Sequence, residues 1–222
     1  SSYRQEFSQQ AVFQLLSRSP KDSAAIVFSP AQILAGYSIF AVFLWGLTID
    51  WWQTLAIVIT FLNIFFAGSV LFKMVLSLIG AADRTHQITK AEINSIDEQS
   101  LPTYSVLVPV YNEPEVIGNL IQALSKLDYP HEKLDVLLLL EEKDLVTIKA
   151  AQAENPPRYI RFIYIPDSQP KTKPKACNYG LAFARGEYLT IYDAEDIPDP
   201  DQLKKAIFAF RQGDPSLICV QA

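Results

Sequence analysis

Several residue types are scarce in this 222-residue chain, and each scarcity excludes a class of protein. The two cysteines, Cys177 and Cys219, lie far apart and form no CxxC spacing, so neither a disulfide framework nor a zinc site is predicted. The two histidines, His86 and His131, belong to no metal-ligand pattern. Methionine occurs once, as Met74, so the chain lacks its initiator and we expect it to be a fragment.

Positive charge is also in short supply. The chain has 19 lysines and arginines against 24 acidic residues, for a net charge of −5, and no basic stripe with interleaved aromatic residues. This balance predicts no nucleic-acid partner. The glycine motifs GxGxxG and GxxxxGK[ST] are missing as well, so a nucleotide would have to be bound by another arrangement.

Charge is almost missing from residues 31–72, where Asp50 is the one formal charge. Each half around Asp50 is close to the roughly 20 apolar residues that a helix needs to cross the hydrocarbon layer. Trp51 and Trp52 lie between the halves and suit a membrane interface. We therefore predict two transmembrane helices within residues 31–80, rather than a buried hairpin in a soluble core.

The basic residues that flank these spans predict their orientation. Arg18 and Lys21 precede the first span, Lys73, Arg84 and Lys90 follow the second, and the short loop between the spans has no basic residue. The positive-inside rule then places both flanks in the cytoplasm. The first span begins too far into the chain, and is too long, for a cleavable signal peptide.

The remaining regions differ in pattern. Residues 1–30 form a polar lead-in with a short helix near residues 6–18, and residues 81–102 form a polar linker. In residues 103–222, short apolar runs alternate with helix-period segments, which predicts an α/β domain with a mainly parallel sheet covered on both faces. We predict strands at residues 104–110, 135–141, 159–166, 187–193 and 216–221. We predict helices at residues 114–127, 144–153, 174–186 and 200–212.

Ligands bind such sheets at the carboxyl ends of the strands, and acidic residues gather at one of these ends. In "YDAED", Asp193 and Glu195 have the D-x-[DE] spacing that lets two carboxylates meet one Mg²⁺ or Mn²⁺ ion shared with phosphates, and Asp196 follows directly. Asp199 and Asp201 are assigned instead to capping of the next helix. The cluster therefore predicts a metal and phosphate site of three acids.

Other strand ends carry further candidates. "KTKPKACN" places Lys171, Lys173 and Lys175 where a helix begins, which suits a diphosphate, although a solvated basic loop has the same composition. Glu141 and Glu142 follow the buried run "VLLLL" and are expected to accept hydrogen bonds from a base or a ribose in a cleft, unless they form a plain exposed strand end. The tip "PVYNEP" could equally be a simple helix entry.

These motifs, in this order, resemble a known family. "SVLVPVYNEPEVI", the acidic pair after the second strand, "KPKACNYGLAFARGEYLTIYDAED" and "PDQLKKA" are similar to the N-terminal half of a family 2 glycosyltransferase of the GT-A fold. With two preceding spans, the chain looks most like the bacterial membrane-embedded group that includes cellulose synthase and exopolysaccharide synthases. The resemblance implies a GT-A domain, truncated here to its donor-binding half, over residues 103–222.

The resemblance also implies roles for individual residues. Tyr111 and Glu113 would lie along the nucleotide base, Glu141 would contact the uracil or ribose with Glu142 as second candidate, and Lys175 would face the diphosphate. In this family the pair after the second strand is usually Asp-Asp rather than Glu-Glu.

The acidic motif is carried over in the same way. Glu195 would be the direct ligand of Mg²⁺ or Mn²⁺, and Asp193 would lie nearer the ribose and phosphate. The last acid of the family's D-x-D motif is an aspartate, and in this chain it is Glu195. The family's catalytic base carboxylate and its Q-x-x-R-W motif would lie beyond residue 222, so the fragment alone would be inactive.

The implied activity is that of an inverting glycosyltransferase. It would move a sugar from a nucleotide-diphospho-sugar, UDP-linked, to a growing glycan at the cytoplasmic face of the bacterial inner membrane. A polyprenyl-phosphate glycosyltransferase shares the strand-end motifs but commonly lacks leading spans. A non-catalytic nucleotide-sensing membrane module is the alternative from another class. The expected partners are a nucleotide-sugar donor, a glycan or lipid-linked acceptor and the bilayer.

Overall fold

The computed structural model describes residues 2–25, 27–82 and 88–220. The chain divides into two compact units, one of Ser1–Arg18 with Ile88–Ala222 and one of Ser19–Gln87. The first helix, α1 (Ser2–Arg18), therefore belongs to the same unit as the C-terminal domain. The sequence predicted this helix over a shorter range and did not predict that it packs on the domain.

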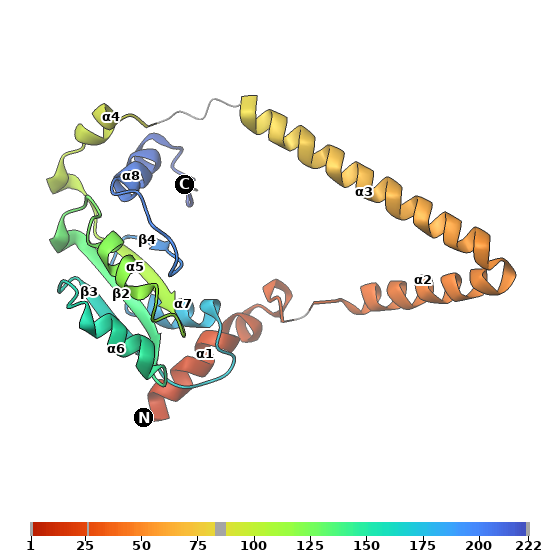
Figure 1. Ribbon diagram of the computed structural model, residues 1–222, viewed down its shortest axis with the longest axis horizontal. Coiled ribbons are helices and arrows are strands. Elements are labelled where there is room, and N and C mark those ends of the chain that lie inside the picture. Colours follow the sequence, from red (N-terminus) through yellow and green to blue (C-terminus); the bar gives the residue numbers. More distant parts are fainter. Residues whose placement is uncertain (1, 26, 83–87, 221–222) are drawn as a thin grey trace. The chain divides into compact units, whose positions relative to one another are not determined.

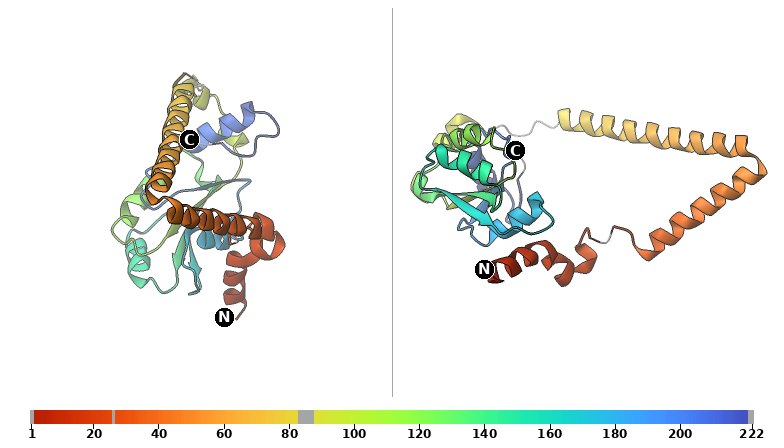
Figure 2. Two further views of the ribbon diagram at one scale, coloured as in Figure 1. Left: turned by 90° about the vertical axis from the view of Figure 1, so that its right-hand side faces the viewer. Right: turned by 60° about the horizontal axis from the view of Figure 1, so that its bottom comes forward.

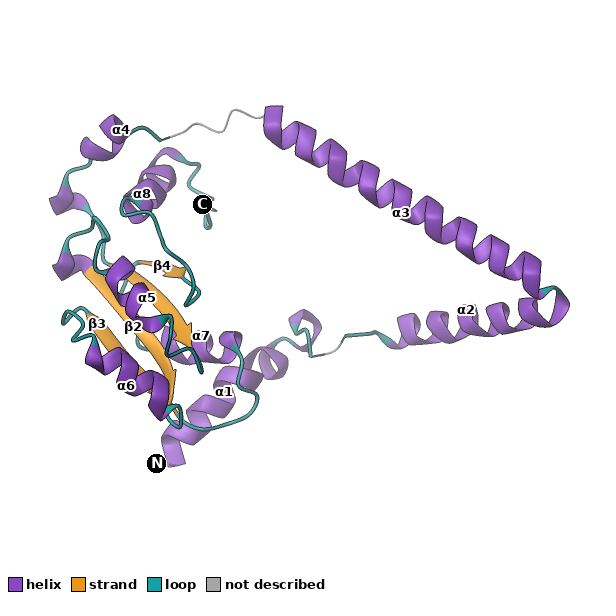
Figure 3. Cartoon of the chain, in the orientation of Figure 1, coloured by secondary structure: helices purple, strands orange, loops and turns teal. Residues whose placement is uncertain are grey.

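The C-terminal domain is built on a four-stranded sheet in which neighbouring strands run parallel (Figure 3). The strand order is β3-β2-β1-β4. The strands are β1 (Tyr104–Val110), β2 (Leu134–Glu141), β3 (Ile160–Ile165) and β4 (Tyr188–Ile191). Every residue of β1 and β2 is buried, because these central strands are covered on both faces. The predicted α/β fold with a parallel sheet is confirmed.

Helices cover both faces of this sheet (Figure 1). One face packs against α5 (Ile117–Leu124), α6 (Leu145–Ala153) and α8 (Gln202–Gln212). The other face packs against α7 (Lys173–Leu181) and α1. The alternate residues of β2 divide between the two faces, Val136, Leu138 and Leu140 joining the first core and Leu137 and Leu139 the second.

Short elements link these layers. They are η1 (Pro20–Asp22), α4 (Lys90–Asn94), η2 (Glu98–Ser100) and η3 (His131–Lys133). α4 begins with a capping box, in which the Thr89 side chain accepts from the Glu92 backbone and Glu92 accepts from the Thr89 backbone. Lys204 of α8 joins this region to the domain through ion pairs with Glu98 at 3.0 Å and Asp128 at 2.8 Å.

The second unit contains two long apolar helices, α2 (Pro30–Ile49) and α3 (Trp51–Ala82), joined at Asp50 (Figure 2). The Ser29 side chain caps α2, and the Asp50 carboxylate accepts from the backbone of Trp52 and Gln53 at 3.0 Å each at the start of α3. Both helices are long and apolar enough to cross a membrane. The two predicted helices are thus present where the sequence placed them.

Two local predictions were wrong. Residues 216–220 form no strand: no described strand pairs with this segment, and Ile218 is 92 % exposed. Residue 221 lies outside the described residues. Asp199 does not cap α8, whose N-cap position is Asp201, and the Asp201 side chain makes no capping hydrogen bond. Lys205 instead draws the Asp201 carboxylate into an ion pair of 2.7 Å, one turn along the helix.

Candidate functional site

A cavity of about 160 Å³ lies where β1, β2 and β3 end. The carboxyl ends of parallel strands meet at one edge of the sheet, which brings these side chains together. Three predicted site residues, Tyr111, Glu113 and Glu141, line this cavity. The other polar or charged lining residues come from the loop after β3 and the start of α7, and they are Lys171, Thr172 and Lys173. The sequence-based grouping of these strand ends is thus reproduced in space.

Glu141 and Lys175 form a buried ion pair beside the cavity. Their side chains are 5 % and 1 % exposed, and Lys175 Nζ lies 2.7 Å from Glu141 Oε1. The same ammonium donates to the Ser168 carbonyl at 3.0 Å. Glu141 Oε2 is buried and has no hydrogen-bond partner among the described residues. The predicted contact of Lys175 with a diphosphate would therefore require this pair to open, whereas Glu141, which lines the cavity, has one buried oxygen without a partner among the described residues.

Two other lysines, Lys171 and Lys173, line the cavity and are more exposed than Lys175. Lys171 Nζ lies 5.0 Å from the centroid of the Tyr111 ring and 3.2 Å from Asp167 Oδ1. The hydrogen bond to Asp167 raises the pKa of Lys171 above its ordinary value. The pKa of Asp167 is correspondingly lowered, mainly by Lys143 and then by Lys171. Lys171 is thus a fixed positive charge over an exposed aromatic face, an arrangement suited to a stacked base and a nearby phosphate.

The predicted acidic cluster follows β4. Asp193 Oδ1 lies 2.9 Å from Lys173 Nζ, and this contact raises the pKa of Lys173. Asp196 Oδ2 accepts the backbone N–H of Asp193 at 2.7 Å, which folds the loop back on itself. Glu195 is exposed. The structure therefore joins the acidic loop to the cavity through Lys173, which lines the cavity and contacts Asp193.

These acids fit a metal ion that is shared with a ligand. Within the described ranges, no three His, Cys, Asp or Glu side chains are grouped closely enough to hold a metal ion by themselves. Mg²⁺ is commonly held by one or two carboxylates and completed by substrate phosphates and water. Asp193 and Glu195, two residues apart at an exposed strand end and next to cationic lysines, match that chemistry better than a closed protein cage.

The tip of β1 is held by a residue that the sequence analysis did not single out. Asp144 Oδ2 accepts the backbone N–H of Asn112 at 2.5 Å, and Asp144 Oδ1 accepts the N–H of Thr147 at 3.2 Å as the N-cap of α6. Asn112 has a φ of 55°, so this bond fixes a left-handed turn beside Tyr111. Although partial burial alone would raise it, these hydrogen bonds hold the pKa of Asp144 below its ordinary value. The sequence signal that could have identified Asp144 as a cap is an aspartate at the start of a segment with helical periodicity.

Glu142, the second candidate after β2, is directed elsewhere. Its side chain is exposed and lines a separate cavity of about 340 Å³ with Arg4, Gln5, Lys143 and Asp167. The structure thus does not bring Glu142 to the cavity of Glu141, because successive residues of a strand end point to opposite faces.

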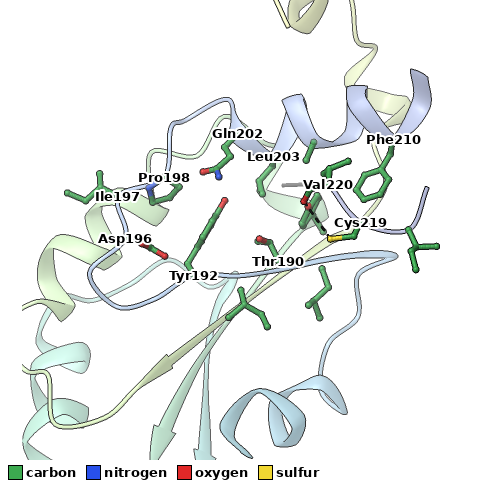
Figure 4. Close-up of a pocket in the computed structure, with 15 residues that line it drawn as sticks. Thr190, Tyr192, Asp196, Ile197, Pro198, Gln202, Leu203, Phe210, Cys219 and Val220 are labelled. Atoms are coloured by element: carbon green, nitrogen blue, oxygen red, sulfur yellow. Dashed lines mark hydrogen bonds between the residues drawn. The ribbon is translucent and has the colours of Figure 1, made fainter. Parts of the chain in front are cut away.

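A larger cavity of about 500 Å³ lies between β4 and α8 (Figure 4). Asp196, Tyr192, Gln202 and Phe210 are among its lining residues. The Tyr192 hydroxyl is buried without a partner among the described residues, and burial raises the pKa of this tyrosine. Asp196 therefore lines the cavity beside α8 and is not among the residues that line the strand-end cavity.

The strand-end cavity, the acid cluster and the parallel sheet agree with the family that the chain matches. Residues 105–222, more than half of the chain, match the family model described as Glycosyl transferase family 2, and the chain belongs to this family.

Individual relatives agree with this assignment. The probable glycosyltransferase YdaM of Bacillus subtilis is 28 % identical over 107 residues, which cover 46 % of this chain and 24 % of YdaM. Cellulose synthase 2 of Novacetimonas hansenii is 30 % identical over 126 residues, covering 56 % of this chain and 8 % of that protein. The chain thus spans about a quarter or less of the length of these curated relatives.

Solved structures with similar folds include two glycosyltransferases. The mannosyltransferase PcManGT of Pyrobaculum calidifontis, in complex with GDP-Man and Mn²⁺, is 29 % identical with a TM-score of 0.47, covering 55 % of this chain and 35 % of its own. TarS 1–349 of S. aureus, in complex with UDP-GlcNAc, is 23 % identical with a TM-score of 0.43, covering 50 % and 31 %.

Proposed function

We propose that this chain supplies the donor site of a membrane-bound inverting glycosyltransferase, which moves a sugar from a UDP-sugar to a growing glycan. The observation that carries the proposal is the grouping of an exposed aromatic ring, a carboxylate with one unpartnered oxygen and two lysines around one cavity next to a D-x-E motif. Membership of glycosyl transferase family 2 supports the reaction class.

The binding roles follow from the contacts. Tyr111, at 48 % exposure, offers a face on which a base can stack, and Glu141 Oε2 can accept from a base N–H. Glu113 lines the same cavity and offers a further acceptor. Lys171 and Lys173 are near enough to this cavity to contact the diphosphate, and α7 begins at Lys173 with its N-terminus directed to the same region. Lys175 is buried and contributes indirectly, because its ion pair stabilises the Glu141 carboxylate.

The acidic loop completes the donor site in this proposal. Glu195 is assigned as the direct ligand of Mg²⁺ or Mn²⁺, with Asp193 beside it and Asp196 holding the Asp193 backbone in place. When bound, the cation would neutralise charge that develops on the leaving diphosphate. Lys173, which contacts Asp193 at 2.9 Å, would then be released from Asp193 to a phosphate oxygen. Proton removal from the acceptor hydroxyl is assigned to a carboxylate outside this chain.

The membrane assignment rests on α2 and α3. Both are long and apolar enough to span a bilayer, and the basic residues on their flanks favour a cytoplasmic donor domain. Similarity to a bacterial cellulose synthase supports a multi-pass protein of the bacterial inner membrane that acts in polysaccharide synthesis. A cytoplasmic domain would draw on cytoplasmic nucleotide sugars, while the product leaves through the membrane.

Transfer of labelled sugar tests this function directly. Membranes that contain the complete protein would be incubated with radiolabelled UDP-glucose, UDP-N-acetylglucosamine or GDP-mannose and Mn²⁺, and incorporation into glycan or lipid would be counted. We expect incorporation from a UDP-sugar that Asp193→Ala or Glu195→Ala abolishes. Asp201→Asn, six to eight positions further along and in an ion pair with Lys205, is the matched control and should keep activity. Equal incorporation by Asp193→Ala and wild type would contradict the proposal.

A further inference from the structure

The N-terminal helix α1 is attached to the element that carries the lysine loop. Phe7 packs on Tyr179 of α7, with ring centroids 5.1 Å apart, and the Ala11 carbonyl accepts from Asn178 Nδ2 at 2.9 Å. Arg4 Nη2 donates to the Tyr164 carbonyl of β3 at 2.7 Å. These contacts place α1 against β3 and α7, the two elements that residues 166–172 connect.

A polar side chain of α1 reaches into that segment. Ser8 is fully buried, at 0 % exposure, and its Oγ lies 2.6 Å from the Oγ of Ser168. A serine in this position is informative, because the apolar contacts of Phe7 and Ala11 would suffice to pack a helix here. A hydroxyl buried without a partner would cost free energy, so the pair is a specific contact.

The contact continues to the donor cavity. Ser168 accepts from Lys175 Nζ through its carbonyl at 3.0 Å, and the same Nζ lies 2.7 Å from Glu141 Oε1. Glu141 lines the cavity and carries the uncommitted Oε2. One chain of contacts thus runs from Ser8 through Ser168 and Lys175 to the carboxylate that lines the cavity.

We propose that α1 is a positioning element of the donor site, with Ser8 as its positioning residue, because it fixes the Ser168 segment and through it the Lys175–Glu141 pair. This inference rests on the proposed function, since it assigns α1 a part in the same site. It gives the first helix a role beyond that of a polar lead-in: loosening α1 opens the loop that carries Ser168 and Lys171 and weakens nucleotide binding.

The test uses the full chain in lipid nanodiscs, with wild type, Ser8→Ala and the control Gln9→Ala, whose side chain is exposed on the same helix. UDP and GDP are titrated in Mn²⁺, and backbone hydrogen exchange is measured without nucleotide. For Ser8→Ala we expect roughly three- to tenfold weaker binding of the nucleotide that wild type binds. We also expect faster exchange in residues 167–172 and unchanged exchange in β1 and β2. Gln9→Ala should match wild type in both measurements.

A second pair of variants separates positioning from general packing. If Ser8 acts through Ser168, the double variant Ser8→Ala/Ser168→Ala should weaken binding about as much as Ser168→Ala alone. Ser168→Ala already removes the contact with Ser8, as well as the 3.5 Å contact of Ser168 Oγ with Lys175 Nζ, so Ser8→Ala has nothing further to remove. Ser8→Cys, which keeps the size of the side chain and weakens its hydrogen bonds, is made in parallel so that a misfolded Ser8→Ala does not decide the result.

The outcomes are distinct. Unchanged binding and exchange in folded Ser8→Ala or Ser8→Cys would overturn the inference while leaving the proposed function intact, and so would additive losses in the double variant. If wild type binds neither UDP nor GDP, the proposed donor site fails and this inference fails with it.

Discussion

Replacement of Lys175, the cationic partner in the buried Lys175–Glu141 pair, should cost the domain much of its stability. Lys175 and Glu141 are 1 % and 5 % exposed, so solvent screens neither charge, and Glu141 Oε2 already lacks a partner among the described residues. In Lys175→Met the carboxylate would stay in the same apolar surroundings without its counter-ion. Breaking a buried pair by removing one partner costs about 3–5 kcal/mol, and we expect a loss of this size in the free energy of unfolding.

Calorimetry of the full chain in detergent micelles at pH 7 measures this loss. A domain of this size loses about 2–4 °C of melting temperature per kcal/mol, so Lys175→Met should melt about 6–20 °C below wild type. Lys143→Met is the matched control, because Lys143 is 72 % exposed in its 2.5 Å pair with Asp167. Exposed pairs contribute about 0–1 kcal/mol, so the control should melt close to wild type.

A double variant tests the stated cause. Glu141→Leu/Lys175→Met removes both charges, and replacement of a buried pair by apolar side chains is often neutral or stabilising. It should therefore recover most of the melting temperature lost by Lys175→Met. A single variant within about 2 °C of wild type, or a double variant no more stable than the single one, would refute the reasoning.

Three further predictions concern other parts of the domain. Gly186→Ala should lose about 1–3 kcal/mol in chemical denaturation, because its new Cβ would clash with the Ser105 backbone nitrogen, whereas Gly118→Ala meets only a flexible side chain and should be neutral or more stable. The lowered pKa of Asp144 stabilises the fold above the ordinary value of 3.8 and this contribution is lost as pH falls through the folded pKa, so melting temperature should fall below about pH 4, and less in Asp144→Asn. Tyr111→Ala should weaken nucleotide binding roughly tenfold in a titration, whereas Tyr111→Phe, which keeps the ring, should bind like wild type.

The sheet could be predicted because its strands carry strong local signals. Residues 104–110 and 135–141 are mainly apolar runs of strand length, and both appear as buried central strands with boundaries within one residue. The segment at residues 216–220 has a similar composition, yet it forms no strand. Strand formation requires a partner in the ladder, and composition alone does not supply one.

The site could be predicted only in part, from the rule that ligands bind parallel sheets at the carboxyl ends of the strands. That rule grouped Tyr111, Glu113 and Glu141 correctly around one cavity. It could not foresee that Lys175 turns inward to Glu141 rather than outward, because this depends on the path of the loop after β3. Nor could it find Ser8, which lies 160 residues from its partner Ser168. Contacts between distant segments leave no local pattern in a single sequence.

The central claim is that this chain binds a nucleotide diphosphate through a divalent cation held by the acidic loop. Calorimetric titration of the full chain in nanodiscs with UDP, in Mn²⁺ and then in EDTA, tests it most directly, beside Asp193→Ala and the control Asp201→Asn. The account predicts binding in Mn²⁺ that EDTA and Asp193→Ala abolish and Asp201→Asn preserves. A folded wild-type chain that binds neither UDP nor GDP, or that binds equally well in EDTA, would contradict it.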